Sequence, residues 1–354
     1  MSTSIVPPST PPRPGVLLLL LGVLTVLLLT ASLALGSIAI PWREVWTILA
    51  GGEPSQPTWG QIVLSIRLPR ALTACLAGAA LAVGGLELQT LFRNPLADPF
   101  LLGISSGASL GVALVVLASG IASAGLFARA GLVGGLGIVG AATAGSALVL
   151  SLVLLLGRRL RHTATLLIVG LMVGYGTGSI ISVLLSFSIP EEVQTYVYWT
   201  FGSFGRVGRA EVGLLATVVF AGLLAAHLQA KGLDALLLGE DLARSLGQNV
   251  PRTRLGIVLS ASLLAGSVTA YCGPIAFLGV AIPHLCRGLF RCSNHRVLLP
   301  ACVLLGASVA LLADLLARLP GADRALPLNA VTALLGAPIV LFLVLRRSDV
   351  APEV

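Results

Sequence analysis

Charged side chains are scarce in this chain of 354 residues, of which only 10% are Asp, Glu, Lys or Arg. Soluble domains carry about 25% charged residues, so these few charges are not enough to cover a water-facing surface. Hydrophobic residues make up 56% of the sequence, and the mean hydropathy is +0.99. The shortage of charge therefore disfavours a water-soluble globular protein and indicates a chain that lies in a lipid bilayer.

Several kinds of site lack the residues they need. Lys231 is the only lysine and does not stand in the pattern G-x-x-x-x-G-K-[ST] of a phosphate-binding loop, so this chain cannot be a P-loop ATPase. The five cysteines show no C-x-x-C spacing and are interpreted as small packing residues. Four scattered histidines do not form a motif such as H-E-x-x-H, which disfavours a membrane-embedded enzyme. We therefore predict no catalytic residue, no metal site and no directly bound cofactor.

Charge is also missing from the middle of the apolar segments. The segment 164–187, for example, contains no ionisable group except Tyr175. Ion-coupled carriers keep an acid or a histidine in the membrane as the coupling site. An ion-coupled secondary transporter is therefore the less favoured alternative.

Apolar runs of the length needed to cross a bilayer, roughly 20 residues, recur along the whole chain. The first lacks a basic lead and a small-residue cleavage site, and its apolar core is too long for a signal peptide, so it is interpreted as a membrane span. The loops between the runs leave no room for a separate soluble domain. The sequence predicts an all-α, polytopic membrane protein with ten transmembrane helices, at roughly 15–37, 68–91, 99–119, 130–156, 164–187, 209–230, 254–271, 275–290, 297–319 and 327–345.

The distribution of basic residues predicts the orientation. With the N-terminus in the cytoplasm, fourteen of the 22 lysines and arginines fall in cytoplasmic segments, as the positive-inside rule requires. An even number of spans places both termini on that side. The net charge of +8 then follows from topology, so membrane lipid is an expected partner and nucleic acid is not.

Two stretches of the chain repeat the same order of features. "RLPRALTACLAGAALAVGG" from Arg67 and "PRTRLGIVLSASLLAGSVTA" from Pro251 each give a Pro/Arg entry and a small-residue helix. A proline turn follows, at Asn94-Pro95 or Gly273-Pro274, and then a glycine-bearing helix. Because the two units run in opposite directions through the predicted membrane, they indicate an inverted repeat of helices 2–5 and 7–10, as in transporters.

Four segments together carry a family resemblance: the run 67–111 with "NPLADPFLLGISSGA", "LGEDLARSLGQNV" at 238–250, "CGPIAFLGVAIPHLCRGL" at 272–289 and "LLADLLARLPGADRALPLNAVTALLGAP" at 311–338. The chain resembles, over nearly its whole length, the permease subunits of bacterial ABC importers for ferric siderophores, haem and cobalamin, the type II importers. The resemblance implies a single transmembrane permease domain over 1–354 in the bacterial inner membrane, with a cytoplasmic tail at 1–14. It also implies a homodimeric pore, two cytoplasmic ATPase subunits that bind ATP and Mg²⁺, and a periplasmic or lipid-anchored substrate-binding protein. Ferric siderophore is the first expected substrate, and haem and cobalamin are the alternatives.

The loop at 231–252 is amphipathic, and two glycines bracket a short helix within it whose first turn is acidic, as the helix dipole favours. The resemblance implies that it forms the coupling helices that sit in a cleft of the ATPase; an ordinary surface helix is the alternative. The residues assigned to it are Leu238, Gly239, Glu240, Asp241, Arg244, Leu246 and Gly247.

Arg67, Arg70 and Arg318 lie at the predicted outer ends of spans, against the positive-inside bias. The resemblance implies that they bind glutamates of the binding protein, because guanidinium groups pair well with carboxylates. The alternative is that they snorkel toward lipid phosphates. It also implies that the loops after the second and fourth spans close the inner end of the pore. Asn94, Leu96 and Thr163 are the gate candidates there, and a short aromatic helix at 191–203 is expected beside the pore.

Four further positions carry expectations of their own. The entry to the last span reads "ALPLN", Ala325 to Asn329, where the family usually has Glu-Leu-Pro-Val-Gly, which puts periplasmic pairing at that corner in doubt. Glu87 replaces an apolar residue near the inner mouth and is expected to pair with Arg93. Asp314 is expected to pair with Arg318, four residues later on the same helix, and His284 is interpreted as structural.

Overall fold

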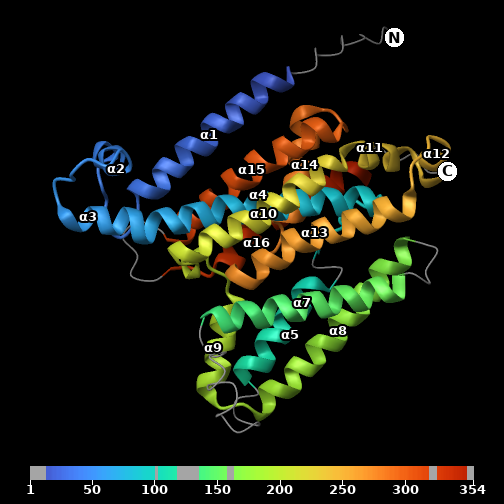
Figure 1. Cartoon of the computed structure of the whole chain (residues 1–354), viewed down its shortest axis with the longest axis horizontal. Helices are drawn as coiled ribbons and strands as arrows, with labels where there is room; N and C mark the ends of the chain where they lie inside the picture. Colours follow the sequence, from blue (N-terminus) through green and yellow to red (C-terminus); the bar gives the residue numbers. More distant parts are fainter. Residues whose placement is uncertain (1–12, 100–102, 118–134, 158–162, 319–324, 349–354) are drawn as a thin grey trace.

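The computed structural model describes residues 13–99, 103–117, 135–157, 163–318 and 325–348 of the chain (Figure 1). Within these ranges all regular secondary structure is helical and no strand occurs, in agreement with the predicted all-α class. The longer helices are α1 (Pro14–Ala34), α4 (Leu68–Phe92), α5 (Ile104–Leu117), α7 (Gly135–Gly157), α8 (Thr163–Phe187), α10 (Arg209–Leu228), α13 (Val250–Cys272), α14 (Leu278–Phe290), α15 (His295–Ala317) and α16 (Leu328–Ser348).

Short helices connect these segments. They are α2 (Trp42–Leu49), α3 (Pro57–Gln61), a π-helical turn η1 (Ile62–Arg67), α9 (Pro190–Thr200), a 3₁₀ turn η3 (Phe204–Arg206), α11 (Ala230–Leu238) and α12 (Glu240–Ser245). In Figure 1, α2 and α3 lie at one end of the molecule and α11 and α12 at the opposite end. We call these the α2 end and the α12 end.

Each of the ten apolar runs of the sequence contains one of the longer helices. Among the described residues, six helices are long and apolar enough to cross a membrane, counting α3 through α4 as one; the others are α1, α8, α10, α13 and α15. Shorter apolar helices occupy the remaining four runs, in α5, α7, α14 and α16. Length and composition thus support a multi-pass membrane fold, and the number ten stays a prediction.

Helix α4 forms the centre of the molecule because its many alanines and glycines let other helices approach closely. It packs against α10, α13, α14 and α15, and most of its residues are buried. At the crossing with α15, a methyl carbon built at Gly78 would overlap the backbone of Gly306. At the crossing with α14, the same carbon at Gly85 would overlap the carbonyl oxygen of Gly279 and lie 2.6 Å from its Cα.

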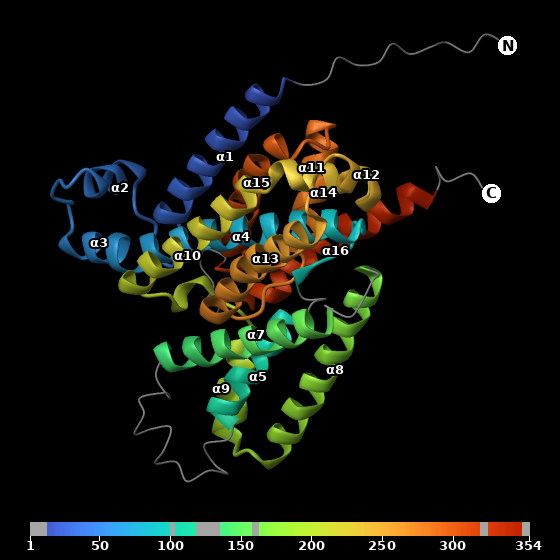
Figure 2. The same cartoon turned by 45° about the vertical axis from the view of Figure 1, so that its right-hand side comes forward.

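A second group of helices, α5, α7, α8 and α9, lies beside the group around α4 in both views (Figures 1 and 2). Within it α5 packs closely on α7, again through glycines at 107 and 145, and α13 contacts both helices from the first group. Helix α8 is the most exposed member: Tyr175 is 66% and Phe187 71% exposed. In water such an apolar surface would be unfavourable, so it indicates a face that lipid or another chain covers.

Candidate functional site

The α12 end carries the loop that the sequence assigned to an ATPase partner. The short helix predicted between Gly239 and Gly247 is α12, which begins directly after Gly239 with Glu240 and Asp241 in its first turn. Arg244 donates to both acids, at 3.0 Å to Glu240 and 2.8 Å to Asp241, and Arg254 of α13 donates to Glu240 at 2.6 Å. These ion pairs fix α12 against the start of α13.

Three leucines four residues apart form an exposed apolar row on this segment. Leu238 and Leu246 are each 62% exposed and Leu242 is 48% exposed, whereas Ala243 on the opposite face is fully buried. Leu242 in α12 and Leu246 directly after it lie one turn apart on the same side, whereas Leu238 ends α11 before the break at Gly239. An apolar row in a polar connecting segment, with no chain packed on it among the described residues, has the character of a partner-binding surface.

A polar cavity of about 250 Å³ opens between this segment and the end of α4. Leu91, Phe92 and Arg93 line it from α4 and its last turn, and Leu236, Glu240 and Asp241 line it from the other side. The predicted coupling loop is thus in direct contact with the turn that follows α4.

That turn contains two of the gate candidates. The side chain of Asn94 accepts a hydrogen bond from the backbone N–H of Leu96 at 3.0 Å, which closes a tight turn. Leu96 is 41% exposed. The interpretation of His284 as structural is consistent with its contact, because its Nε2 lies 3.1 Å from the carbonyl oxygen of Pro95. The third candidate, Thr163, is the first residue of α8, and its side chain lies outside the described part of the structure.

At the α2 end, the three candidate docking arginines all have internal partners. Arg67 is 5% exposed and donates to the carbonyl oxygens of Leu33 and Ala34 at 2.8 Å and to that of Ile38. It thereby satisfies carbonyls at the C-terminal end of α1, a helix end that has no intrahelical donors of its own. Arg67 therefore joins α1 to α4.

Arg70 and Arg318 share one carboxylate. Oδ1 of Asp314 accepts from Arg70 at 2.9 Å, and Oδ2 accepts from Arg318 at 2.7 Å, which confirms the expected pair of Asp314 with Arg318. Arg318 also donates to the hydroxyl of Ser32 at 2.9 Å. The carboxylate is 1% exposed, so the cluster is a buried join of α1, α4 and α15. That these arginines receive carboxylates from a binding protein stays a prediction.

The expected pair of Glu87 with Arg93 is wrong. Glu87 lies fully buried between α4 and α13, where its Oε1 accepts a hydrogen bond from the Ser260 hydroxyl at 2.5 Å. Arg93 instead donates to the backbone carbonyl of Leu236. The six-residue separation turns the two side chains to different faces of α4, which the sequence spacing alone should have indicated.

Asn329, which stands at the entry to α16 where the family usually has glycine, makes two hydrogen bonds. Its backbone N–H donates to the carbonyl of Phe201 at 3.0 Å, and its side-chain oxygen accepts from the N–H of Ala276 at 3.1 Å. The asparagine therefore joins α16 to the segments after α9 and before α14, a contact that a glycine side chain could not make.

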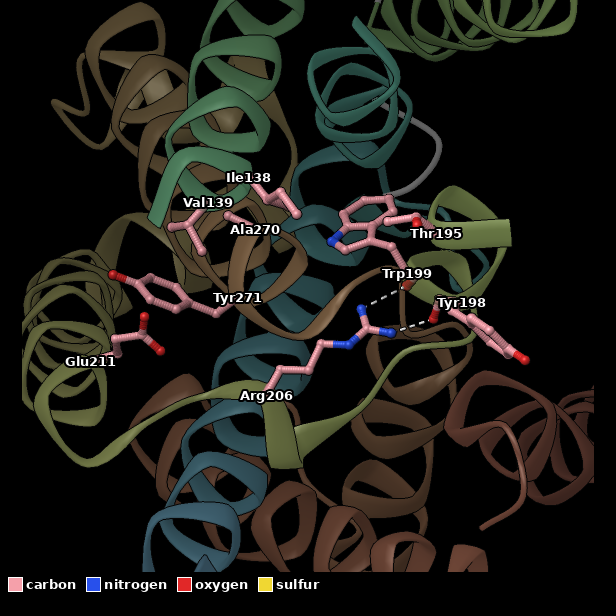
Figure 3. A pocket seen from close by; sticks show the side chains of 9 residues that line it. All are labelled: Ile138, Val139, Thr195, Tyr198, Trp199, Arg206, Glu211, Ala270 and Tyr271. Carbon is pink, nitrogen blue, oxygen red and sulfur yellow. Dashed lines mark hydrogen bonds between the residues drawn. The ribbon is translucent and has the colours of Figure 1, made fainter. Parts of the chain in front are cut away.

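The aromatic helix expected at 191–203 is α9, and a cavity of about 300 Å³ lies beside it (Figure 3). Trp199 and Tyr198 line the cavity from α9, and Tyr271 and Glu211 face them from the other side. Arg206 lies between the two groups and donates to the carbonyls of Trp199, at 3.2 Å, and Tyr198. Burial lowers the pKa of Arg206, which still carries its charge at the C-terminal end of α9, where the helix dipole favours a cation.

Sequence reasoning missed a hydrogen-bonded chain at the α12 end. Asp234 of α11 accepts from the backbone N–H of His295 at 3.0 Å and lies 2.7 Å from its Nδ1. The other ring nitrogen lies 2.8 Å from the Thr90 hydroxyl of α4. The three residues are far apart in the sequence, so only their common placement near the predicted cytoplasmic ends of helices could have suggested the contact.

Comparison with known proteins gives a consistent result. Residues 24–346 match the model of the FecCD transport family. The vitamin B12 import system permease protein BtuC of Escherichia coli is 38% identical over 334 residues, which cover 93% of this chain and 94% of that protein. The hemin transport system permease protein HmuU of Yersinia pestis is 35% identical over 338 residues, or 95% and 97% of the two chains.

Solved structures agree. An inward-facing structure described as a metal-chelate type ABC transporter superposes with a TM-score of 0.80 at 29% identity, covering 94% of this chain and 99% of that one. PsaBC from Streptococcus pneumoniae shares the fold, with a TM-score of 0.52 at 19% identity over 77% of this chain and 89% of that one.

Proposed function

We propose that this chain, which belongs to the FecCD transport family, is the membrane-spanning permease subunit of an importer in the bacterial inner membrane. The importer would be driven by ATP and would depend on a binding protein. The observation that carries the proposal is the exposed row Leu238–Leu242–Leu246, on the segment that Arg93, in the turn after α4, contacts at the Leu236 carbonyl. The chain has no phosphate-binding loop, so a separate ATPase supplies the energy and the leucine row is where it binds. ATP and Mg²⁺ belong to that partner.

The substrate we propose is a bulky chelate of a metal: a corrinoid, haem or a ferric siderophore. The two relatives are named as permeases for vitamin B12 and hemin, so ferric siderophore, the first expectation from the sequence, has no priority over these. A buried ion-coupling site is not needed for this mechanism. Among the described acids, Glu87 and Asp314 are fully buried. Glu87 accepts a hydrogen bond from Ser260, and Asp314 is paired with Arg70 and Arg318, which argues against the secondary-transporter alternative.

The packing of the helices bears on the predicted repeat. Helices α5, α7 and α8 contact one another pairwise, and α14, α15 and α16 do the same. Helix α4 precedes the first set, α13 precedes the second, and α4 and α13 pack against each other. This parallel order supports the inverted repeat of helices 2–5 and 7–10 predicted by the two Pro/Arg entries.

A second copy of the chain is the proposed partner in the membrane. Apolar side chains on α8 and α16 are exposed, with Leu334 at 75% and Phe187 at 71%. Lipid would cover such surfaces equally well, so the distinction needs a measurement. Cross-linking of single cysteines on α8 and α16 between differently tagged copies would separate a homodimer from a monomer in lipid.

The test of function is ATP-dependent uptake by the assembled complex. Proteoliposomes that contain this permease, its ATPase and the binding protein should accumulate cobalamin, hemin or a ferric siderophore only when ATP is enclosed with the ATPase. Accumulation driven by a proton or sodium gradient without ATP would refute the proposal. Uptake of one chelate and not the other two would identify the substrate.

The leucine row gives a direct prediction for the partner interface. Leu242→Asp should weaken the affinity for the ATPase about 30-fold or more, because an interface residue of the hot-spot kind contributes about 2 kcal/mol or more. The permease should stay folded because Leu242 is exposed. Ser245→Asp places the same charge on an exposed position of α12 and is the control. Equal affinities of the two variants, measured by pull-down titration in detergent, would exclude the row from the interface.

A further inference from the structure

Arg93 connects the end of α4 to the end of α11. Its Nε and Nη2 donate to the carbonyl oxygen of Leu236 at 3.2 and 3.0 Å. The carbonyls in the last turn of a helix lack intrahelical donors, and a cation is favoured there by the helix dipole. Arg93 itself has a left-handed backbone with φ of 48°, a conformation uncommon for a residue other than glycine. The turn after α4 is thus shaped so that this side chain reaches α11.

Gly239 makes the approach of Arg93 possible. It separates α11 from α12 and has φ of 122°, which L side chains rarely adopt. A methyl carbon at this position would lie 2.9 Å from Nη2 of Arg93. The joint between the two coupling helices is therefore in contact with the guanidinium, and α12, which carries Leu242, follows immediately.

A second connection runs through His295. This ring is 1% exposed and bridges the Asp234 carboxylate of α11 and the Thr90 hydroxyl of α4, at 2.7 and 2.8 Å. Thr90 and Arg93 are three residues apart, so both connections from α11 end on the last turn of α4. His295 is also the first residue of α15, which brings that helix into the same unit.

The gate turn begins at the next residue, Asn94, and is held on its other side by His284 at the carbonyl of Pro95. A displacement of α11 would therefore pull on Thr90 and Arg93 while α14 holds Pro95. The turn 94–96 is the part of the chain between these two attachments.

We infer that Arg93 and His295 are the positioning residues that transmit movement of the α11–α12 segment to the gate turn at Asn94–Leu96. The inference rests on the proposed function, since it assigns the route from the ATPase-binding row to the pore. These two hydrogen-bonded connections couple ATP hydrolysis to opening of the gate turn, and neither residue contacts ATP or substrate.

The experiment measures how much substrate is imported per ATP hydrolysed in proteoliposomes of the full complex. Arg93→Ala should lower this ratio about tenfold, a typical size for a coupling between two sites, while the ATPase rate stays within about twofold of that of the wild type. Arg93→Lys, which keeps one donor for the Leu236 carbonyl, should recover most of the ratio. Arg296→Ala removes an exposed arginine from the first turn of α15 and is the matched control.

Thr90→Val tests the second connection separately, because it removes only the hydroxyl that His295 contacts and keeps the shape of the side chain. It should lower the ratio less than Arg93→Ala, and the two changes together should lower it more than either alone. If Arg93→Ala fails to assemble, Thr90→Val still decides the question.

Two results would overturn the inference. An unchanged ratio in Thr90→Val and in Arg93→Ala would show that these contacts do not couple the sites. A parallel fall of ATPase rate and import, with the ratio preserved, would make them structural only. Failure of the proposed function is a distinct outcome, since the wild-type complex would then import none of the three chelates with ATP.

Discussion

Asp314→Ala is expected to lower the free energy of unfolding by about 3–5 kcal/mol, the usual effect of removing one partner from a buried ion pair. The carboxylate is 1% exposed and accepts hydrogen bonds from Arg70 and Arg318, which are 21% and 13% exposed. Without it, two guanidinium groups lose their acceptor and repel one another, and Arg67 adds a third positive charge nearby. The junction of α1, α4 and α15 should open at this end.

The measurement is the unfolding midpoint of the purified permease in detergent, followed by heating or by titration with a denaturing detergent. Asp241→Ala is the matched control, because that carboxylate also pairs with an arginine but is fully exposed. Exposed pairs contribute about 1 kcal/mol or less, so this variant should unfold close to the wild type. Equal losses in the two variants would contradict the structural role of Asp314.

An apolar replacement of the whole cluster separates charge from packing. The triple variant Arg70→Met, Asp314→Leu, Arg318→Met leaves no unpaired charge, and such replacements are often neutral or stabilising. It should recover most of the stability that Asp314→Ala loses. A triple variant as unstable as the single one would mean that the shape of the side chains, and not the pairing of charge, holds the three helices together.

The same cluster bears on how a binding protein could dock. A carboxylate that arrives from outside must share Arg70 and Arg318 with Asp314, and the accessible part of the cluster belongs to Arg70. Arg67 donates hydrogen bonds to carbonyl oxygens at the end of α1 and to that of Ile38, which follows α1. Charge reversal at Arg67 would therefore break the join between α1 and α4, and loss of docking in that variant would not distinguish a docking role from misfolding. Arg70→Glu would disrupt the cluster in the same way, so the apolar triple variant, which removes both guanidinium groups and should stay folded, is the better test of docking.

The sequence predicted the helices well and their partners poorly, for one physical reason. A run of apolar residues determines locally that a segment is helical in lipid, and the glycines and acids around α12 likewise signal its two ends. What a polar side chain contacts depends on which helices cross nearby. Arg67 was expected to point outward as a free cation, but the uncapped end of α1 lies within its reach. Glu87 meets Ser260 because α13 crosses α4 there, 173 residues later in the chain.

The same reason explains which residues of the candidate site could be predicted from the sequence and which could not. The residues of the coupling loop could be assigned because they follow one another in the sequence and resemble a family motif. The connection from Asp234 through His295 to Thr90 brings together three helices, and no local pattern marks it. Similarly, Asn329 in place of the usual glycine suggested a lost contact, but in the folded chain it forms hydrogen bonds with Ala276 and Phe201.

Gly85→Leu is expected to prevent stable folding of the permease, and Gly85→Ala should already lower the free energy of unfolding by about 3 kcal/mol or more. Overpacking a close-packed site typically costs about 1–3 kcal/mol. Here even a methyl group would overlap the backbone carbonyl of Gly279, which cannot rotate away as a side chain could. Helix α14 would have to move off α4, and the hydrogen bonds from the Gln89 amide to the carbonyls of Gly279 and Val280, at 3.3 and 3.1 Å, would be lost.

The displacement should reach the turn 94–96 as well, because Nε2 of His284 in α14 lies 3.1 Å from the carbonyl oxygen of Pro95. Thermal stability in detergent and the yield of monodisperse protein measure the effect. Gly213→Ala in α10 is the control: nothing lies within 4 Å of its added methyl group, and replacing an exposed helical glycine by alanine stabilises by up to about 1 kcal/mol. If Gly85→Ala unfolds at the same temperature as Gly213→Ala, the crossing of α4 and α14 is not as close as the structure places it.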